Sequence, residues 1–199
     1  MISSQFNPGG SGYPGLSMKV ILSSILLLCI ALLPATASPQ SIAQRTDAAM
    51  HRVFGETATL SKQTIPIDNA LAERVEKRSG QPVLGKVIVH EAAVNGKLIG
   101  FGIVDDVRGK AQPITYMTLF HPDGTIAEIE VLVYREPYGG EIQYETFRRQ
   151  FRGKKASSPI RVGNDIQNIA GATISSKAIT NGAKKIAVLF DELRKENKF

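Results

Sequence analysis

The middle of the chain carries four β-type segments separated by short turn signals, and this pattern constrains the fold most. Asn95–Gly96 is a two-residue sequence that favours a tight hairpin, and His121–Gly124 is a second turn signal. β-branched residues are frequent in the four segments, which are residues 83–92, 98–107, 114–120 and 125–134. The pattern predicts an antiparallel meander with one buried face.

The last of these segments shows the alternation of a half-buried strand. Its apolar residues Ile129, Val131 and Val133 alternate with Glu128 and Glu130. Because successive side chains of a strand point to opposite faces, we expect the apolar residues on the core side and the glutamates on the other.

Helical patterns flank the strands. A helix is expected over 41–54, with Gly55 at its end, and a polar, threonine-rich connection follows it. Asp68 and Gly80 mark the start and the end of a second helix. A short helix is expected over 146–151.

The C-terminal segment has an apolar stripe at helical spacing. From Ser176 onward, four turns place apolar residues on one side, namely Ile179, Ala183, Ile186, Phe190 and Leu193. The predicted fold is therefore α+β: an antiparallel β-meander packed against N-terminal helices and a long C-terminal amphipathic helix.

The N-terminal residues have the pattern of a secretory signal. Met18–Lys19 precedes an apolar run over 20–33, and Pro34–Ser38 contains an A-x-A cleavage site. We expect a signal peptide at 18–37, a polar leader or upstream start at 1–17, and one domain at 38–199. An uncleaved membrane anchor is the alternative, although the run is shorter than the about 20 residues of a spanning helix. The expected location is periplasmic or otherwise extracytoplasmic.

Composition excludes several classes of function. The only cysteine, Cys29, lies inside the apolar run, so the domain has no thiol for disulfides, iron–sulfur clusters or haem attachment. The net charge of +6 comes from scattered basic residues, so nucleic-acid binding is not expected. The three histidines are isolated in the sequence, and no metal site is expected.

Small residues and hydroxyls are concentrated directly before the last helix, in the segment 169–176. The start of a helix offers free backbone N–H groups and a partial positive charge, which suit a phosphate group. The simpler alternative is that Thr173 or Ser175 caps the helix.

Three ordered segments resemble the FMN-binding domain family. Residues 171–179 resemble its flavin-attachment segment, 134–141 its preceding glutamate- and glycine-containing loop, and 147–154 its aromatic-Gln-Phe-x-Gly-Lys segment. The family includes subunits of sodium-translocating NADH:quinone reductase and of a related electron-transport complex, together with small secreted flavoproteins. The resemblance implies FMN joined through a phosphoester to Thr173 by a flavin transferase.

Two positions depart from the family pattern. The family has an acidic residue six positions before the threonine and a hydroxyl three before it, where this chain has Gln167 and Ala170. These departures keep open the alternative of a non-redox binding or assembly module that has lost the flavin.

The resemblance and the local chemistry together give a set of expected cofactor contacts. Aromatic side chains are expected as walls for the flavin ring, Glu136 and Gln150 as ring partners, and a lysine near the phosphate. Phe147 and Phe151 are four residues apart and fit a helical core face equally well, and Glu136 fits ordinary loop chemistry. The expected contacts are Gly171, Ala172, Thr173, Ile174, Ser175, Ser176, Lys177, Glu136, Tyr138, Gly139, Phe147, Gln150, Phe151 and Lys154.

No acid–base or nucleophile constellation accompanies these residues, so an electron carrier or redox subunit is expected rather than a stand-alone enzyme. The expected partners are the flavin transferase and a membrane or extracytoplasmic redox protein.

Overall fold

The computed structural model describes residues 40–199 together with Met1, Gln5, Gly9 and Gly10. The predicted signal peptide at 18–37 lies outside these described residues, as does most of the predicted leader. The chain divides into a unit 1–39 and a unit 40–199, and the second contains all the helices and strands described below. Within the described part of the chain, no helix is long and apolar enough to cross a membrane.

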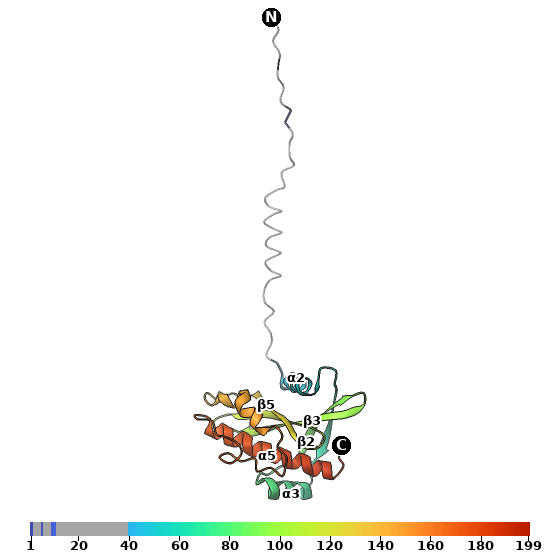
Figure 1. Ribbon diagram of the computed structural model, residues 1–199, viewed down its shortest axis with the longest axis vertical. Coiled ribbons are helices and arrows are strands. Elements are labelled where there is room, and N and C mark those ends of the chain that lie inside the picture. The colour runs from blue at the N-terminus through green and yellow to red at the C-terminus, as the bar shows by residue number, and fades with distance from the viewer. Residues whose placement is uncertain (2–4, 6–8, 11–39) are drawn as a thin grey trace. The chain divides into compact units, whose positions relative to one another are not determined.

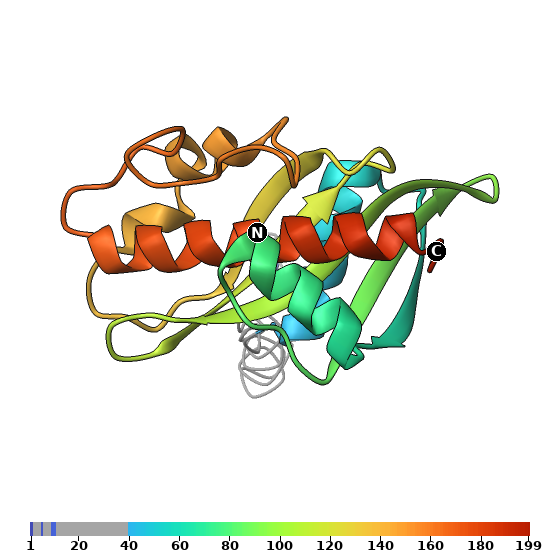
Figure 2. The same cartoon turned by 90° about the horizontal axis from the view of Figure 1, so that it is seen from below.

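A five-stranded antiparallel sheet forms the centre of the domain, with its strands in sequence order (Figures 1 and 2). The predicted meander is confirmed. The strands are β1 (Thr59–Pro66), β2 (Lys86–Val94), β3 (Lys97–Arg108), β4 (Pro113–Phe120) and β5 (Ile126–Val133).

The strand β1 differs from the expectation of a polar connection after the first helix. It is an edge strand of which only Ile65 is buried, so its sequence lacks the apolar alternation of a half-buried strand. Pairing with β2 over its whole length holds it in the sheet.

The predicted hairpin joins β2 to β3. Both turn residues, Asn95 (φ 51°) and Gly96 (φ 74°), have the left-handed backbone that a two-residue turn of this kind requires. The chain reverses there without a longer loop.

Helices cover both faces of the sheet, which corrects the expectation of a single buried face. The helices α3 (Asn69–Ser79) and α5 (Thr173–Lys195) lie on one face, and α2 (Ile42–Phe54) lies on the other (Figures 1 and 2). Each face has its own apolar cluster. An irregularity in the β4–β5 pairing between Thr115 and Tyr116 shifts the alternation, so Val133 packs on the α2 side, away from Ile129 and Val131.

The C-terminal helix α5 carries the predicted stripe, and all five of its apolar residues are buried. Phe190 stacks on Phe120, with ring centroids 4.3 Å apart and an interplanar angle of 7°. Phe101 and Phe199 pack against the same ring. The helix is therefore fixed to the sheet by an aromatic core.

The flanking helices have the predicted ends. Ser41 forms a capping box with Gln44 at the start of α2, and Asp68 Oδ1 accepts a hydrogen bond of 2.8 Å from Leu71 N at the start of α3. Gly80 ends α3 in the left-handed conformation. The short helix expected over 146–151 is present as α4 (Glu145–Arg148) and the 3₁₀ turn η2 (Arg149–Phe151), preceded by η1 (Gly140–Gln143).

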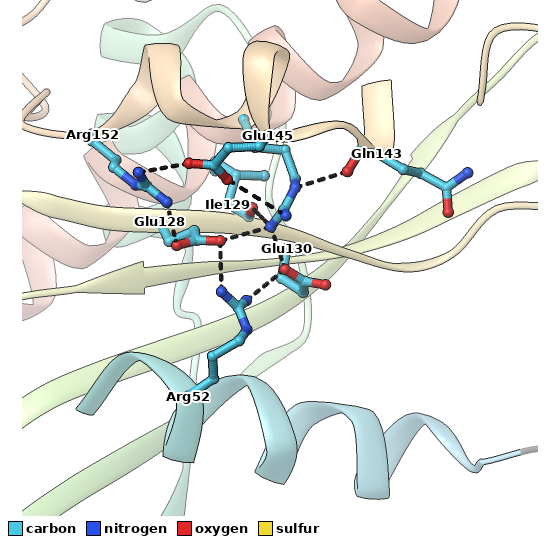
Figure 3. A network of polar contacts seen from close by, with 8 residues as sticks. Arg52, Glu128, Ile129, Glu130, Gln143, Glu145 and Arg152 are labelled. Atoms are coloured by element: carbon cyan, nitrogen blue, oxygen red, sulfur yellow. Dashed lines mark hydrogen bonds and ion pairs between the residues drawn. The ribbon is translucent and has the colours of Figure 1, made fainter. Parts of the chain in front are cut away.

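A network of ion pairs holds α2 and the α4–η2 segment to β5 (Figure 3). Glu128 is only 4% exposed and binds Arg52 of α2 at 2.9 Å and Arg152 at 2.8 Å. Arg148 pairs with both Glu128 and Glu130. The two glutamates do face away from the aromatic core, but they meet arginines there and Glu128 is buried.

Candidate functional site

The helix α5 begins at Thr173 without a side-chain cap. Ala172 is its N-cap residue, and no side chain accepts a hydrogen bond from the first turn. The alternative in which Thr173 or Ser175 caps the helix is therefore wrong. The N–H groups of the first turn remain available for an anion.

Two of the three hydroxyl groups of this turn have hydrogen-bond partners. Thr173 is exposed, and its Oγ1 accepts a hydrogen bond of 3.0 Å from Asn168 Nδ2. Ser175 Oγ lies 3.1 Å from Tyr134 Oη. Ser176 is fully buried, and its Oγ has no hydrogen-bond partner among the described residues.

A cavity of about 540 Å³ opens beside this turn. Its walls come from the start of α5, the loop after β5 and the turn between β3 and β4. The lining residues are Lys110, Ala111, Glu136, Pro137, Tyr138, Gly171, Ala172, Thr173, Ile174 and Ser175. The structure thus brings seven of the expected contacts to one place.

Glu136 fixes the β3–β4 turn. Its Oε1 accepts hydrogen bonds from the backbone N of Ala111 at 2.7 Å and of Gln112 at 3.0 Å. These backbone hydrogen bonds lower the pKa of Glu136, so the carboxylate is ionised at neutral pH. A Cβ at Gly109 would collide with this carboxylate. The structural role expected for Glu136 in its loop is therefore present: its Oε1 binds the β3–β4 turn and holds Lys110 and Ala111 at the cavity.

The loop after β5 packs directly on the helix start. Tyr134 Oη donates a hydrogen bond to the carbonyl oxygen of Tyr138 and also contacts Ser175. Gly139 has a φ of 84°, and a Cβ there would lie 3.1 Å from the Cβ of Ala172. Close approach of loop and helix thus needs a glycine at this position.

Two large apolar side chains stand at the rim of the cavity. Tyr138 is 81% exposed and Ile174 is 49% exposed. Lys110 adds a cation beside them. This combination of an apolar rim, a cation and an uncapped helix start can hold a flat apolar ring that carries a phosphate.

Several expected contacts lie away from the cavity. Phe147 and Phe151 are buried in the core with ring centroids 5.4 Å apart, as the core alternative described. Lys177 is exposed and does not line the cavity. A direct contact of these residues with a cofactor stays a prediction.

Gln150 and Lys154 brace the segment that leads to Thr173. Gln150 Oε1 accepts a hydrogen bond of 2.6 Å from Gln167 N, and Lys154 Nζ lies 2.9 Å from Asp165. Burial opposes ionisation of Asp165, but hydrogen bonds from Arg161 N and Lys154 outweigh it and lower the pKa of this carboxyl. In the structure these side chains position the loop.

Sequence reasoning missed Lys110, Ala111, Pro137, Tyr134 and Asn168. The first two lie in a segment that carries only the signal of a turn, and no local pattern tells which turn meets the start of α5. Within the described residues, no group of three or more His, Cys, Asp or Glu side chains is arranged to hold a metal ion.

Two curated proteins resemble the chain. The G subunit of the proton-translocating ferredoxin:NAD(+) oxidoreductase complex of Clostridium ljungdahlii is 30% identical over 110 residues, which is 52% of this chain and 60% of that protein. The G subunit of the Na(+)-translocating ferredoxin:NAD(+) oxidoreductase complex of Acetobacterium woodii is 30% identical over 111 residues, which is 51% of this chain and 54% of that protein. The chain therefore spans somewhat more than half the length of each relative.

A solved structure has the same fold. The crystal structure of Shewanella oneidensis NqrC aligns with 89% of this chain and 98% of its own, at a TM-score of 0.51 and 14% sequence identity. At this identity the likeness concerns the fold alone.

The family match covers the cavity. Residues 109–188 match the FMN-binding domain family, and every residue that lines the cavity lies inside this range. Residues 109–188 of this chain are therefore similar to the FMN-binding domain family.

Proposed function

We propose that the chain binds FMN in the cavity at the start of α5 and serves as an electron-transfer subunit or partner of a membrane redox complex. One observation carries this proposal: the cavity of about 540 Å³ has Thr173 and an uncapped helix start in its wall and lies within the family match. The two relatives, described as subunits of ferredoxin:NAD(+) oxidoreductase complexes, support the membrane complex as partner.

The residues present fit the parts of FMN. The free N–H groups at Thr173 and the cation of Lys110 suit the phosphate. The exposed apolar surfaces of Tyr138 and Ile174 suit the isoalloxazine ring, which would cover them. When bound, the flavin supplies the redox chemistry, and this chain orients it and limits its contact with water.

A helix start alone does not retain a flavin. The helix dipole contributes about 0.3–2 kcal/mol, whereas micromolar affinity needs about 8 kcal/mol. The ring pocket or a covalent bond must supply the difference. This comparison favours covalent attachment of the flavin, because a weakly bound flavin would dissociate in a dilute extracytoplasmic space.

The surroundings of Thr173 support such a bond. The residue is exposed, and its Oγ1 accepts a hydrogen bond from Asn168, so the hydroxyl remains able to donate its own proton to an acceptor. In the attachment Oγ1 would attack the phosphorus of a phosphoanhydride of FMN supplied by the transferase: the Oγ1–P bond forms, the P–O bond of the anhydride breaks, and the leaving phosphate group takes up the hydroxyl proton. Relative to threonine and free FMN, the product has lost one water. We assign the step to a flavin transferase, and the signal peptide expected at 18–37 would take the chain to the periplasm.

The intact mass of the denatured protein tests the proposal, after secretion from cells that contain a flavin transferase. We expect the mass of cleaved chain plus one FMN less one water, together with flavin absorbance. Thr173→Ala should lose both, and Thr173→Ser should keep them because it retains the hydroxyl.

Each departure from this result has its own meaning. Flavin that is released on denaturation would overturn the covalent bond and leave the binding site. An unmodified, colourless wild-type protein would overturn both and favour the binding or assembly module, with Gln167 and Ala170 as the decisive changes.

A further inference from the structure

The sheet opens between β2 and β3, far along the strands from their hairpin. The two strands pair from the hairpin only as far as Val89 and Ile103. β2 nevertheless continues to pair with β1 as far as Lys86, and β3 with β4 as far as Arg108. A cavity of about 630 Å³ lies at this opening and shares no residue with the cavity at Thr173.

The walls of this second cavity are mostly aliphatic. Its floor is made by the buried side chains of Ile103, Ile186 and Leu189. At its mouth Leu84 is 82% exposed, and Ile88 is also exposed. Among the described lining residues there is no Phe, Tyr or Trp. Such walls favour a flexible hydrocarbon chain over a flat ring, since rings are held by aromatic contacts.

The charges of the cavity leave one cation available. Lys185 Nζ lies 3.0 and 2.9 Å from the two carboxylate oxygens of Asp105, so this pair is balanced inside the protein. Burial lowers the pKa of His90, which is therefore neutral at pH 7. Lys86 is exposed in the lining and forms no ion pair with any described residue. It can meet the anionic end of a ligand.

We propose that this cavity binds a free fatty acid, with the hydrocarbon chain between β2 and β3 and the carboxylate at Lys86. We commit to a single free chain because the cavity of about 630 Å³ at the opening between β2 and β3 has the volume of a site for one small ligand. The site would be independent of flavin binding.

Calorimetric titration of the purified full chain with decanoate, below its micelle concentration, tests the proposal. We expect one saturable site. Affinity should rise by about threefold to fourfold per methylene from octanoate to dodecanoate, because each buried methylene adds a similar increment. Decylamine should bind more weakly than decanoate, since its charge is repelled by Lys86.

Two variants locate the site. Ala43 is an exposed residue of α2 that lines the cavity, so Ala43→Trp should fill it and lower decanoate affinity at least about tenfold. Ala70→Trp places the same side chain on an exposed position of α3 outside the cavity and should leave affinity unchanged. Lys86→Gln should lower decanoate affinity about threefold without changing that for decanol, whereas Lys97→Gln at the hairpin should change neither.

Unchanged binding in Ala43→Trp, or no saturable binding in the wild type, would overturn the proposal. Sedimentation with phosphatidylglycerol vesicles without binding of monomeric decanoate would overturn it in favour of a membrane-facing surface. None of these readouts depends on bound flavin, so the FMN proposal stands or fails separately.

Discussion

Where α5 packs on the sheet, aromatic rings stack on one another, whereas where α2 packs on the opposite face, arginines bind carboxylates. Phe190 contacts Phe101, Phe120 and Phe199 on the first face. On the second, Arg52 joins α2 to Glu128 of β5. Apolar packing is independent of pH and is resistant to salt, while ion pairs depend on both. The cavity at Thr173 is built on the helix that the aromatic core fixes.

The largest expected effect comes from breaking the aromatic core. Phe190→Ala should lower the free energy of unfolding by about 3–5 kcal/mol, because it leaves a large void between α5 and the sheet. Phe54→Ala on the α2 face should cost about 1–2 kcal/mol, since Phe54 is only partly buried and meets His121 edge-on. Urea unfolding followed by circular dichroism measures both, and equal costs would contradict the difference between the faces.

The next effect concerns the ion pairs. Burial opposes the ionisation of Glu128, but hydrogen bonds from Arg152 and Arg52 and the charges of Arg52 and Arg148 outweigh it, so the pKa of Glu128 is lowered. The folded state therefore prefers the ionised form. The resulting stabilisation is present above the ordinary pKa of 4.5 and is lost as the pH falls through the lowered folded-state value.

Glu128→Gln should accordingly cost about 1–3 kcal/mol at pH 7 and flatten the loss of stability below about pH 4.5. Urea unfolding at several pH values measures this. A residual slope is expected, because the pKa values of Asp165, Asp191 and Glu192 are also lowered. An unchanged slope in the variant would mean that Glu128 does not stabilise the α2 face.

Replacing one glycine on each face by alanine compares how tightly the two faces are packed, and the expected effects are smaller. A Cβ at Gly182 of α5 would lie 2.5 Å from Tyr116 Oη and 2.6 Å from Val107 Cγ1. Tyr116 is fully buried and donates a hydrogen bond of 2.8 Å to Asp105, so it has no room to move. Gly182→Ala should therefore cost about 1–3 kcal/mol, in spite of the higher helix propensity of alanine.

Gly102→Ala is the matched change on the α2 face. Its Cβ would meet only the ends of two flexible side chains, Met117 and Met50. Methionine adapts to such changes, and the cost should be below about 1 kcal/mol. Thermal unfolding of the two variants measures the difference, and a larger cost for Gly102→Ala would show that the α2 face is the more tightly packed one.

Local patterns in the sequence predicted the parts of the fold that depend on neighbouring residues. Asn95–Gly96 gave the hairpin, and the stripe ending at Leu193 gave α5. β1 was missed because its stability comes from pairing with β2 and not from its own apolar residues. The burial of Glu128 was missed because its partner Arg52 lies 76 positions earlier in the chain.

The same distinction holds at the candidate site. The segment 171–175 was predicted because it is contiguous and opens a helix. Lys110 and Ala111 are held at the cavity by Glu136, which binds Ala111 from 25 positions away. A contact of this kind follows from the register of the strands, which no single segment specifies.

The contacts of Glu136 and Tyr134 at the cavity imply that folding precedes any modification that depends on the cavity around Thr173. Ser175 meets Tyr134 across 41 positions, and Ala111 meets Glu136 across 25, so the wall around Thr173 exists only after the sheet and α5 have come together. A newly made, extended chain offers the threonine but not its surroundings. A flavin transferase that recognises those surroundings would modify only molecules that have finished folding. Attached flavin would then mark a correctly folded molecule.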